Sequence, residues 1–514
     1  MTLTQDQSDL INAPINSSLL LTGSAGTGKT TAASLRVQKM VEMGIPGESI
    51  MVLVPQRSLA SQYYKQVLSS EFPPGGQPAI LTFNGLAQRM ITLFWPLIAD
   101  AGGFKSAKKP FKFLTIETAQ YHLAELVEPL RTQGYFESLT IDPNRLYSQI
   151  LDNLNKSAIV GFHPSEIADR LTRAWIGKPA QANIYQQAQD CALKFREFCL
   201  AHNFLDFSLQ LTLFTRHLWP SLICKEYIRK NYQHLIYDNI EEDYPVAHDF
   251  VRDLMPDLES ALLIQDTDGG LRSFLGADPN SASNLAVECK GKLIFAQSLV
   301  TSSGIQEFQQ ILNESILHRH LNVKEKRASH HSHSVRGFRF YPEAIDWVIS
   351  EIHSLIDEKN VPPGEIAVLT PYLSDSLRFS FSTRFDKSEI PFTTHRPSRS
   401  LYDEPAVKTM LTLVKLAHPS WGLHSSPHEI RTAFAHSISG CDYARADLIA
   451  RSLVRISNQQ WVMNPFDQLI PEMQERITFT VGEFYESIRN WLQNNQETGG
   501  GELDHWISRL YGDL

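Results

Sequence analysis

Short apolar runs alternate with longer segments of helical periodicity along the first part of the chain. Five of these runs are candidates for buried strands, at residues 18–22, 49–55, 79–83, 234–240 and 260–266. Runs of this length without polar alternation are typical of strands that are covered on both faces of a parallel sheet. Residues from about 95 to 204 follow a helical pattern instead. We therefore predict a parallel α/β domain that is interrupted by a helical insertion.

The second half of the chain predicts a further, incomplete α/β domain. The runs 291–297 and 365–371 are two more strand candidates, and the pattern from Arg396 to Leu514 is mostly helical. We predict a first domain in 1–95 and 204–285, a helical insertion in 96–203, a partial second domain in 286–395 and, in 396–514, an incomplete helical insertion of that second domain.

A polar, basic and histidine-rich stretch covers residues 318–337. Metal binding by His330, His331 and His333 is one interpretation, but these histidines lack the i, i+4 spacing that puts two ligands on one helix face. A solvated linker is the favoured interpretation.

A glycine-rich stretch follows the first predicted strand and precedes a helical segment. Residues 23–30 read GSAGTGKT, a full match to the pattern G-x-x-x-x-G-K-[ST]. In such a loop, backbone N–H groups point at phosphate oxygens beside the positive end of the helix. Lys29 would reach the β and γ phosphates, and the Thr30 hydroxyl would bind Mg²⁺. The predicted nucleotide-binding residues of this loop are Gly23, Ser24, Ala25, Gly26, Thr27, Gly28, Lys29, Thr30 and Thr31.

The composition is that of an ordinary soluble protein, with 42% hydrophobic and 20% charged residues among 514. The formal net charge is −9, so contact with nucleic acid would have to come from a local basic groove. Five cysteines without C-x-x-C spacing favour a reduced, cytoplasmic protein without a disulfide framework or zinc site. We expect neither a signal peptide nor a membrane span.

Further stretches follow the glycine-rich loop in a fixed order. They are "VPQRSLASQ" (54–62), "LTFNGLAQRM" (81–90) and "NFLDFSLQL" (203–211). The second resembles the T-F-H-S-[LF]-[AC] motif of superfamily 1 DNA helicases of the UvrD/Rep type, and the third resembles the L-D-F-x-x-L segment of that family. The first departs from the family's T-F-T-N and looks more like the L-V-P-x-Q stretch of AddB-type recombination subunits. The resemblance implies a RecA-like first domain that binds ATP, with single-stranded DNA contacts at Thr82, Phe83 and Asn84.

The opening stretch "LTQDQSDLI" (3–11) resembles the motif whose glutamine reads adenine in this family, which by position is Gln7. Thr4 and Gln7 also fit a capping box at a helix start. Both roles stay open for Gln7.

The stretch "LIYDNIEEDYP" (235–245) stands where the family has the second Walker motif, V-D-E-x-Q-D. The resemblance assigns the Mg²⁺ carboxylate to Asp238. The general-base position holds Asn239, an amide without usable basicity. Glu241 and Glu242 are candidate substitutes, although they occupy the family's glutamine and aspartate positions. Loss of a positioned base costs roughly 10²–10⁴ in rate, so we predict weak hydrolysis.

Residues 264–279 resemble the next helicase motif, and Phe274 keeps an aromatic ring that can stack on a base. Gly269 replaces the glutamine that senses the γ-phosphate, and Leu275 replaces an arginine. Leu299 and Val300 take the places of an adenine-stacking tyrosine and a γ-phosphate arginine. Because an arginine on transferred phosphate is typically worth roughly 10³–10⁵ in rate, these changes also predict weak hydrolysis.

The leading interpretation is an ATP-binding, UvrD-like helicase-family protein of DNA repair or recombination, with single-stranded DNA and a recombination-complex subunit as partners. Two later family motifs have no match, so the natural protein lacks them or the sequence is a fragment. One alternative is a non-catalytic ATP-binding scaffold of a recombination complex, as in AddB. Another is a P-loop kinase or switch protein unrelated to DNA.

Overall fold

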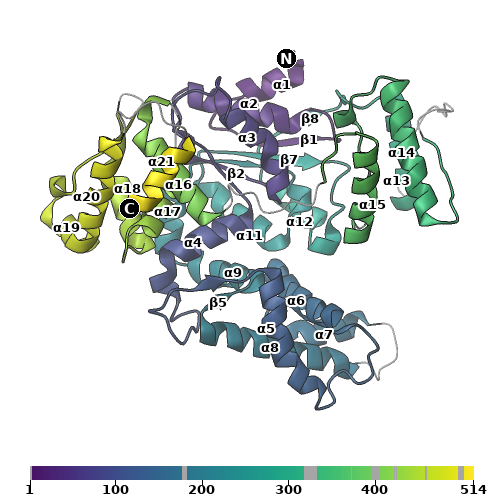
Figure 1. The fold of residues 1–514 in the computed structure, drawn as a ribbon, viewed down its shortest axis with the longest axis horizontal. Coiled ribbons are helices and arrows are strands. Elements are labelled where there is room, and N and C mark those ends of the chain that lie inside the picture. Colours follow the sequence, from purple (N-terminus) through teal and green to yellow (C-terminus); the bar gives the residue numbers. More distant parts are fainter. Residues whose placement is uncertain are drawn as a thin grey trace. The chain divides into compact units, whose positions relative to one another are not determined.

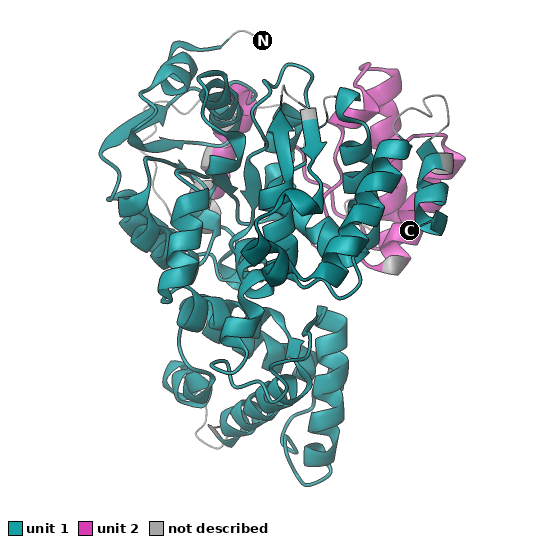
Figure 2. Ribbon diagram, turned by 90° about the vertical axis from the view of Figure 1, so that its left-hand side faces the viewer, with its two compact units in different colours: residues 1–300, 405–514 teal, residues 301–404 magenta. Residues whose placement is uncertain are grey.

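The computed structural model describes residues 3–175, 182–317, 333–371, 373–394, 404–421, 423, 425–457, 460–495 and 503–513. The chain forms two compact units, residues 1–300 together with 405–514, and residues 301–404 (Figure 2). Most of the histidine-rich stretch, residues 318–332, lies outside the described residues. Its linker and metal-binding interpretations therefore stay predictions.

A six-stranded sheet forms the core of the first unit (Figure 1), in the order β3-β2-β6-β7-β1-β8. All neighbouring strands run parallel. The strands are β1 (Ser18–Gly23), β2 (Ile50–Leu53), β3 (Ala79–Leu81), β6 (His234–Tyr237), β7 (Ser260–Asp266) and β8 (Gly291–Phe295). The predicted parallel α/β fold is confirmed.

Helices cover both faces of this sheet, because successive strand residues point to opposite sides. Ile50 and Val52 pack in a cluster with residues of α1 (Gln5–Asn12), α2 (Lys29–Glu42) and α3 (Ser61–Val67). Met51 and Leu53 pack in a second cluster with residues of α4 (Phe83–Ile98), α11 (Pro245–Leu254) and α12 (Pro279–Ala286). Figure 1 shows α1 and α2 above the sheet and α4, α11 and α12 below it. Continuous apolar runs are therefore what these strands require.

The last strand of the sheet corrects one sequence assignment. The pattern places residues 291–297 in a second domain, but β8 pairs in parallel with β1, with Leu293 opposite Leu21. An apolar run predicts a strand without saying which sheet it joins, and here it extends the first sheet at its edge.

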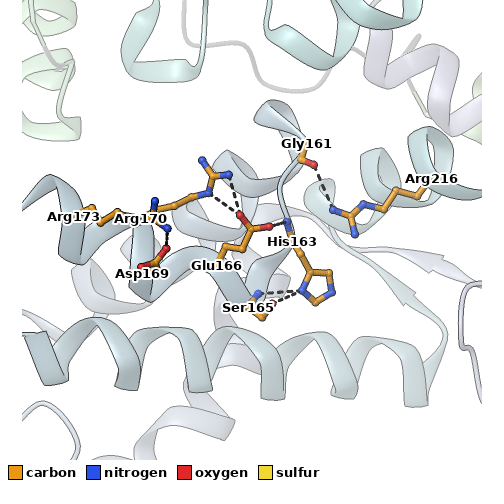
Figure 3. A network of polar contacts seen from close by, with 8 residues as sticks. All are labelled: Gly161, His163, Ser165, Glu166, Asp169, Arg170, Arg173 and Arg216. Carbon is orange, nitrogen blue, oxygen red and sulfur yellow. Dashed lines mark hydrogen bonds and ion pairs between the residues drawn. The ribbon is translucent and has the colours of Figure 1, made fainter.

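The helical insertion between β3 and β6 is confirmed. It contains α5 (Ile116–Arg131), α6 (Pro143–Val160), α7 (Ile167–Ala174) and α8 (Ala182–His202), and α9 (Phe207–Leu213) and α10 (Leu222–Asn231) lead back to the sheet. The short strands β4 (Lys112–Phe113) and β5 (Phe204–Leu205) pair at its base. Figure 3 shows the turn from α6 to α7, where Arg216 donates to the carbonyl of Gly161 at 3.4 Å and Glu166 accepts from the N–H of His163 at 3.1 Å. Gly161 has a φ of 93°, which ends α6 with a left-handed residue.

Residues 405–514 group with the first unit, although the sequence pattern assigns them to the second domain. The predicted helical character holds for their described part, apart from one pair of strands. Its elements are α16 (Pro405–Ala417), α17 (Pro427–Ser437), α18 (Tyr443–Leu453), β9 (Val454–Ser457), β10 (Gln460–Met463), α19 (Pro471–Ile477), α20 (Phe479–Asn494) and α21 (Leu503–Asp513). Arg431 of α17 donates to the hydroxyl of Tyr227 on α10 and to the carboxylate of Asp447 on α18, both at 2.9 Å. This buried arginine connects the C-terminal helices to the sheet-bearing part of the unit.

The second unit has its own small helical core. It contains α13 (Ser303–Leu317), α14 (Tyr341–Asp357) and α15 (Asp375–Lys387), and Ile345, Ile349 and Leu377 are buried in its core cluster. The predicted strand at 365–371 is wrong, since these residues form no strand and Leu369 is 92% exposed. A strand needs a hydrogen-bonding neighbour, and the described residues of 301–404 contain no other strand. No described helix in either unit has both the length and the apolarity to cross a bilayer.

Candidate nucleotide and DNA site

The glycine-rich loop joins β1 to α2 at the carboxyl edge of the sheet, where the strand ends of β6 and β7 also lie. Gly26 and Gly28 have φ values of 78° and 81°, a left-handed conformation that glycine adopts without steric cost. A Cβ at Gly28 would clash with the side-chain amide of Gln7. Because α2 begins at Lys29, the loop N–H groups lie at the positive end of a helix. This geometry is suited to phosphate.

The other predicted loop residues lie as a phosphate-binding turn requires. The hydroxyl of Thr27 donates to the carbonyl of Ser24 at 3.0 Å, which closes the turn around Ala25. Thr31 lies in the first turn of α2. The described chain therefore brings residues 23–31 together in one continuous cradle.

The ammonium group of Lys29 is buried and held by three acceptors. It donates to the carbonyl oxygens of Gly23 at 3.0 Å and Ser24 at 2.7 Å, and it forms an ion pair with the carboxylate of Asp266 at the end of β7. Asp266 is not part of the motifs matched in the sequence, although its place at the end of a buried strand is a usable signal. A bound phosphate would have to compete with this carboxylate for Lys29.

Asp238 follows β6 and is 1% exposed. Its Oδ2 accepts hydrogen bonds from the hydroxyls of Thr30 and Tyr63, both at 2.8 Å, and its Oδ1 accepts the N–H of Asn239 at 2.9 Å. Burial raises the pKa of Asp238, and the hydrogen bonds from Tyr63 and Thr30 act against this rise. Burial also raises the pKa of the Tyr63 phenol well above its ordinary value, so the phenol stays a hydrogen-bond donor. The two residues predicted to bind Mg²⁺ thus meet, and their hydroxyl and carboxylate oxygens suit this cation.

Asn239 has a left-handed backbone, with φ of 56° and ψ of 48°, a conformation that asparagine tolerates better than most residues. Its side-chain nitrogen lies 3.5 Å from Oε1 of Glu241. Glu241 is 1% exposed, and its Oε2 accepts the N–H of Asp266 at 3.0 Å. Burial raises the pKa of Glu241 to about 7. Its basicity suits a general base at neutral pH, but its carboxylate is enclosed.

Glu242 has a different role from the one considered in the sequence. Its Oε1 accepts the N–H groups of Gly270 at 2.7 Å and Leu271 at 3.1 Å, and its Oε2 accepts the N–H of Arg272 at 3.1 Å. Three backbone donors therefore engage this carboxylate. The structure does not support Glu242 as a substitute base, because it anchors the loop after β7.

Gln7 forms the capping box of α1. Its Oε1 accepts the N–H of Thr4 at 3.0 Å, and the Thr4 hydroxyl accepts the N–H of Gln7 at 3.3 Å. Its buried Nε2 lies against Gly28 of the loop. The N–H of Leu299 donates to the carbonyl of Gly26 at 2.9 Å, so the residue at the family's tyrosine position also contacts the loop. The adenine role of Gln7 stays a prediction.

A cavity of about 480 Å³ opens between the end of the sheet and the helical insertion. Thr82, Asn84 and Phe274, three of the predicted DNA contacts, are among its lining residues, together with Lys156 and Arg272. Phe274 is 71% exposed.

Phe83, the fourth predicted DNA contact, is not part of this surface. Its ring is buried against Phe214 and Phe250, with ring centroids 5.5 Å and 5.3 Å apart. Helix α4 begins at Phe83 and turns this side chain into the core, whereas its neighbours Thr82 and Asn84 line the cavity. The prediction of Phe83 as a DNA contact is corrected, because the ring has no free face.

A parallel sheet with a strand, glycine loop and helix at its carboxyl edge defines a P-loop protein with a RecA-like domain. The family model of the UvrD/REP helicase N-terminal domain matches residues 3–290, more than half of the chain. The chain therefore belongs to the UvrD/Rep helicase family, whose members bind DNA and use ATP and Mg²⁺. No curated protein sequence matches it. The alternative of an unrelated kinase or switch protein is set aside.

Proposed function

We propose that this chain binds ATP with Mg²⁺ at the glycine-rich loop and single-stranded DNA at the cavity, and that it hydrolyses ATP slowly, in DNA repair or recombination. One observation carries the proposal. Lys29, Thr30 and Asp238 converge at one edge of the sheet, while the neighbouring general-base position holds the amide of Asn239.

The loop residues have distinct roles in nucleotide binding. The backbone N–H groups of residues 24–28 would surround the phosphates, and Lys29 would exchange Asp266 for phosphate oxygens. Thr30 and Asp238 would hold Mg²⁺, which when bound neutralises phosphate charge and orients the phosphates. Each of these groups already lies at the edge of the sheet in the described structure.

Slow hydrolysis follows from several changes that act in the same direction. Asn239 cannot accept a proton from water, and both oxygens of Glu241 face protein donors. Gly269, Leu275 and Val300 carry no group that can bind a γ-phosphate. Such losses are not additive, but all of them lower the expected rate.

The cavity supports the DNA part of the proposal. Phe274 presents an exposed ring at its wall, where an unpaired base can stack. Arg272 and Lys156 also line the cavity, but Lys156 forms an ion pair with Asp152 at 2.7 Å. The carboxylates of Asp206, Glu242 and Asp243 lie in the same lining, so the exposed ring of Phe274, and not a local positive charge, supports this part of the proposal.

Binding and turnover of the purified chain test this proposal. We expect calorimetric ATP binding that Lys29→Ala abolishes, and oligonucleotide binding that Phe274→Ala weakens and that falls with rising salt. We expect turnover below about 0.1 s⁻¹, under the usual range of enzymes. Fast hydrolysis accelerated by DNA would overturn the slow-hydrolysis part, and absence of ATP binding would overturn the whole proposal.

A scaffold role in a recombination complex is the second candidate. It is favoured by the "VPQ" stretch at 54–56, which looks like AddB, and by Asn239. A scaffold would bind ATP without any turnover, with or without DNA, and would co-purify with a motor subunit. The cytoplasm is the proposed location, since all five cysteines are free thiols, as a reducing compartment would keep them.

A further inference from the structure

Tyr63 lies on α3, outside every motif that the proposed function uses, and its phenol reaches the carboxylate of Asp238. We propose that Tyr63 is a positioning residue that shields Asp238, so that nucleotide binding depends only weakly on Mg²⁺. This inference rests on the proposed ATP-binding function. It assigns a role to a side chain that the sequence motifs do not mark.

The geometry around Asp238 leads to this role. Oδ2 accepts the hydroxyls of Thr30 and Tyr63, both at 2.8 Å. A carboxylate oxygen has two lone pairs, so these two donors satisfy Oδ2 completely. Oδ1 accepts the N–H of Asn239 at 2.9 Å. The carboxylate thus has protein donors on both oxygens.

Burial explains why such donors are needed. Asp238 is 1% exposed, and a buried carboxylate is costly unless it is paired or hydrogen-bonded. Among the described residues, no cationic side chain forms an ion pair with Asp238. Tyr63, itself 1% exposed, therefore supplies part of the compensation that a cation would otherwise supply.

Shielding of Asp238 has a consequence for the nucleotide. An unshielded carboxylate beside the loop repels the phosphates, and Mg²⁺ removes that repulsion. Two hydroxyl donors on Oδ2 weaken the same repulsion in the absence of the metal. ATP without Mg²⁺ should therefore bind nearly as well as ATP with Mg²⁺.

The adjacent tyrosine provides a matched control. Tyr64 is 45% exposed, and its hydroxyl donates to the carbonyl of Ile80 at 3.4 Å. Tyr63→Phe and Tyr64→Phe each remove one hydroxyl from neighbouring positions of the same helix, and only the first touches Asp238.

Calorimetric ATP binding in excess Mg²⁺ and in EDTA tests the inference. The measured quantity is the ratio of the Kd in EDTA to the Kd in Mg²⁺. We expect Tyr63→Phe to raise this ratio roughly tenfold over the wild type, as loss of a charge-assisted hydrogen bond predicts. Tyr64→Phe should leave it unchanged. Equal ratios in all three proteins would overturn the inference while leaving the proposed ATP binding intact.

A stability measurement distinguishes failure of the proposed Tyr63 role from failure of the proposed ATP binding. Tyr63→Phe and Asp238→Asn, singly and together, are compared by urea unfolding without nucleotide. We expect the two effects to be non-additive, because the residues share a hydrogen bond. Additive effects would overturn the Tyr63 role even if the wild type failed to bind ATP, a result that would itself reject the proposed function.

Discussion

Oε1 of Glu241 lies 2.6 Å from the place where a side chain at position 269 would put its Cβ, and Cγ of Glu241 lies 2.8 Å from it. Positions 241 and 269 both differ from the family's motifs, and their side chains would compete for the same space. Glu241 fills the space that the family's γ-phosphate glutamine would need at position 269. The absence of a side chain at Gly269 is required by the present position of Glu241.

Replacing Gly269 alone with the family's glutamine should therefore destabilise the folded protein. We expect Gly269→Gln to lower the free energy of unfolding by about 1–3 kcal/mol, the usual cost of overpacking. In a Glu241→Ala background the same change should cost less, because the space is open. Urea unfolding of the four proteins measures the coupling. Gly364→Gln is the control, since no atom lies within 4 Å of a Cβ there. An equal penalty in both backgrounds would contradict this competition for space.

Glu241 should make stability dependent on pH. Burial raises its pKa from about 4.5 to about 7, so the folded protein holds the proton more tightly than the unfolded chain. The stabilisation is complete below about pH 4.5 and is lost as the pH rises through about 7. Glu241→Gln should therefore be more stable than the wild type at pH 8, by up to about 3 kcal/mol, and similar to it near pH 4.5. Urea unfolding at pH 5, 6.5 and 8 tests this, and a difference that does not change with pH would contradict it.

The ion pair between Lys29 and Asp266 should weaken nucleotide binding, because the carboxylate competes with phosphate for the ammonium group. We expect Asp266→Asn to lower the Kd for ATP roughly five- to tenfold. Asp268→Asn, which removes a carboxylate from the same loop, should have little effect. Titration calorimetry provides the comparison. Weaker ATP binding by the Asp266→Asn variant would show that Asp266 supports the site instead of competing with it.

Substitutions at Phe83 and Phe274 should have different effects: one should change folding stability and the other DNA affinity. Phe274→Ala removes an exposed ring and should weaken oligonucleotide binding by about 1–3 kcal/mol, with an unchanged melting temperature. Phe83→Leu changes a buried ring and should lower stability by about 1 kcal/mol without changing DNA affinity. Fluorescence anisotropy and thermal unfolding of both variants are the measurements. The reverse pattern would place the DNA surface elsewhere.

The strands of the sheet could be predicted because parallel strands buried on both faces need uninterrupted apolar runs. The run at 18–22 corresponds to β1 and the run at 260–266 to β7. The glycine-rich loop could also be predicted, since its spacing is fixed by backbone geometry. The sheet that β8 joins was not predictable, because strand pairing depends on long-range contacts that a local pattern does not contain.

The side-chain contacts around the glycine-rich loop could likewise not be predicted from the local sequence pattern. Asp238 could be predicted from its place after a strand, but its contact with Tyr63 joins residues that are 175 positions apart. The ion pair of Asp266 with Lys29 and the backbone contacts of Glu242 likewise depend on how loops meet at the sheet edge. Phe83 was predicted as a DNA contact by its motif, and the direction of its side chain depends on where α4 begins.

The hydrogen bond from Leu299 to Gly26 gives the chain that leaves the sheet an unusual starting point. After β8, the polypeptide is tied to the phosphate-binding turn before it continues to the next unit. Any rearrangement of that turn must either pull residues 299–300 with it or break this bond. One backbone hydrogen bond thus fixes the point at which the chain leaves the phosphate-binding turn.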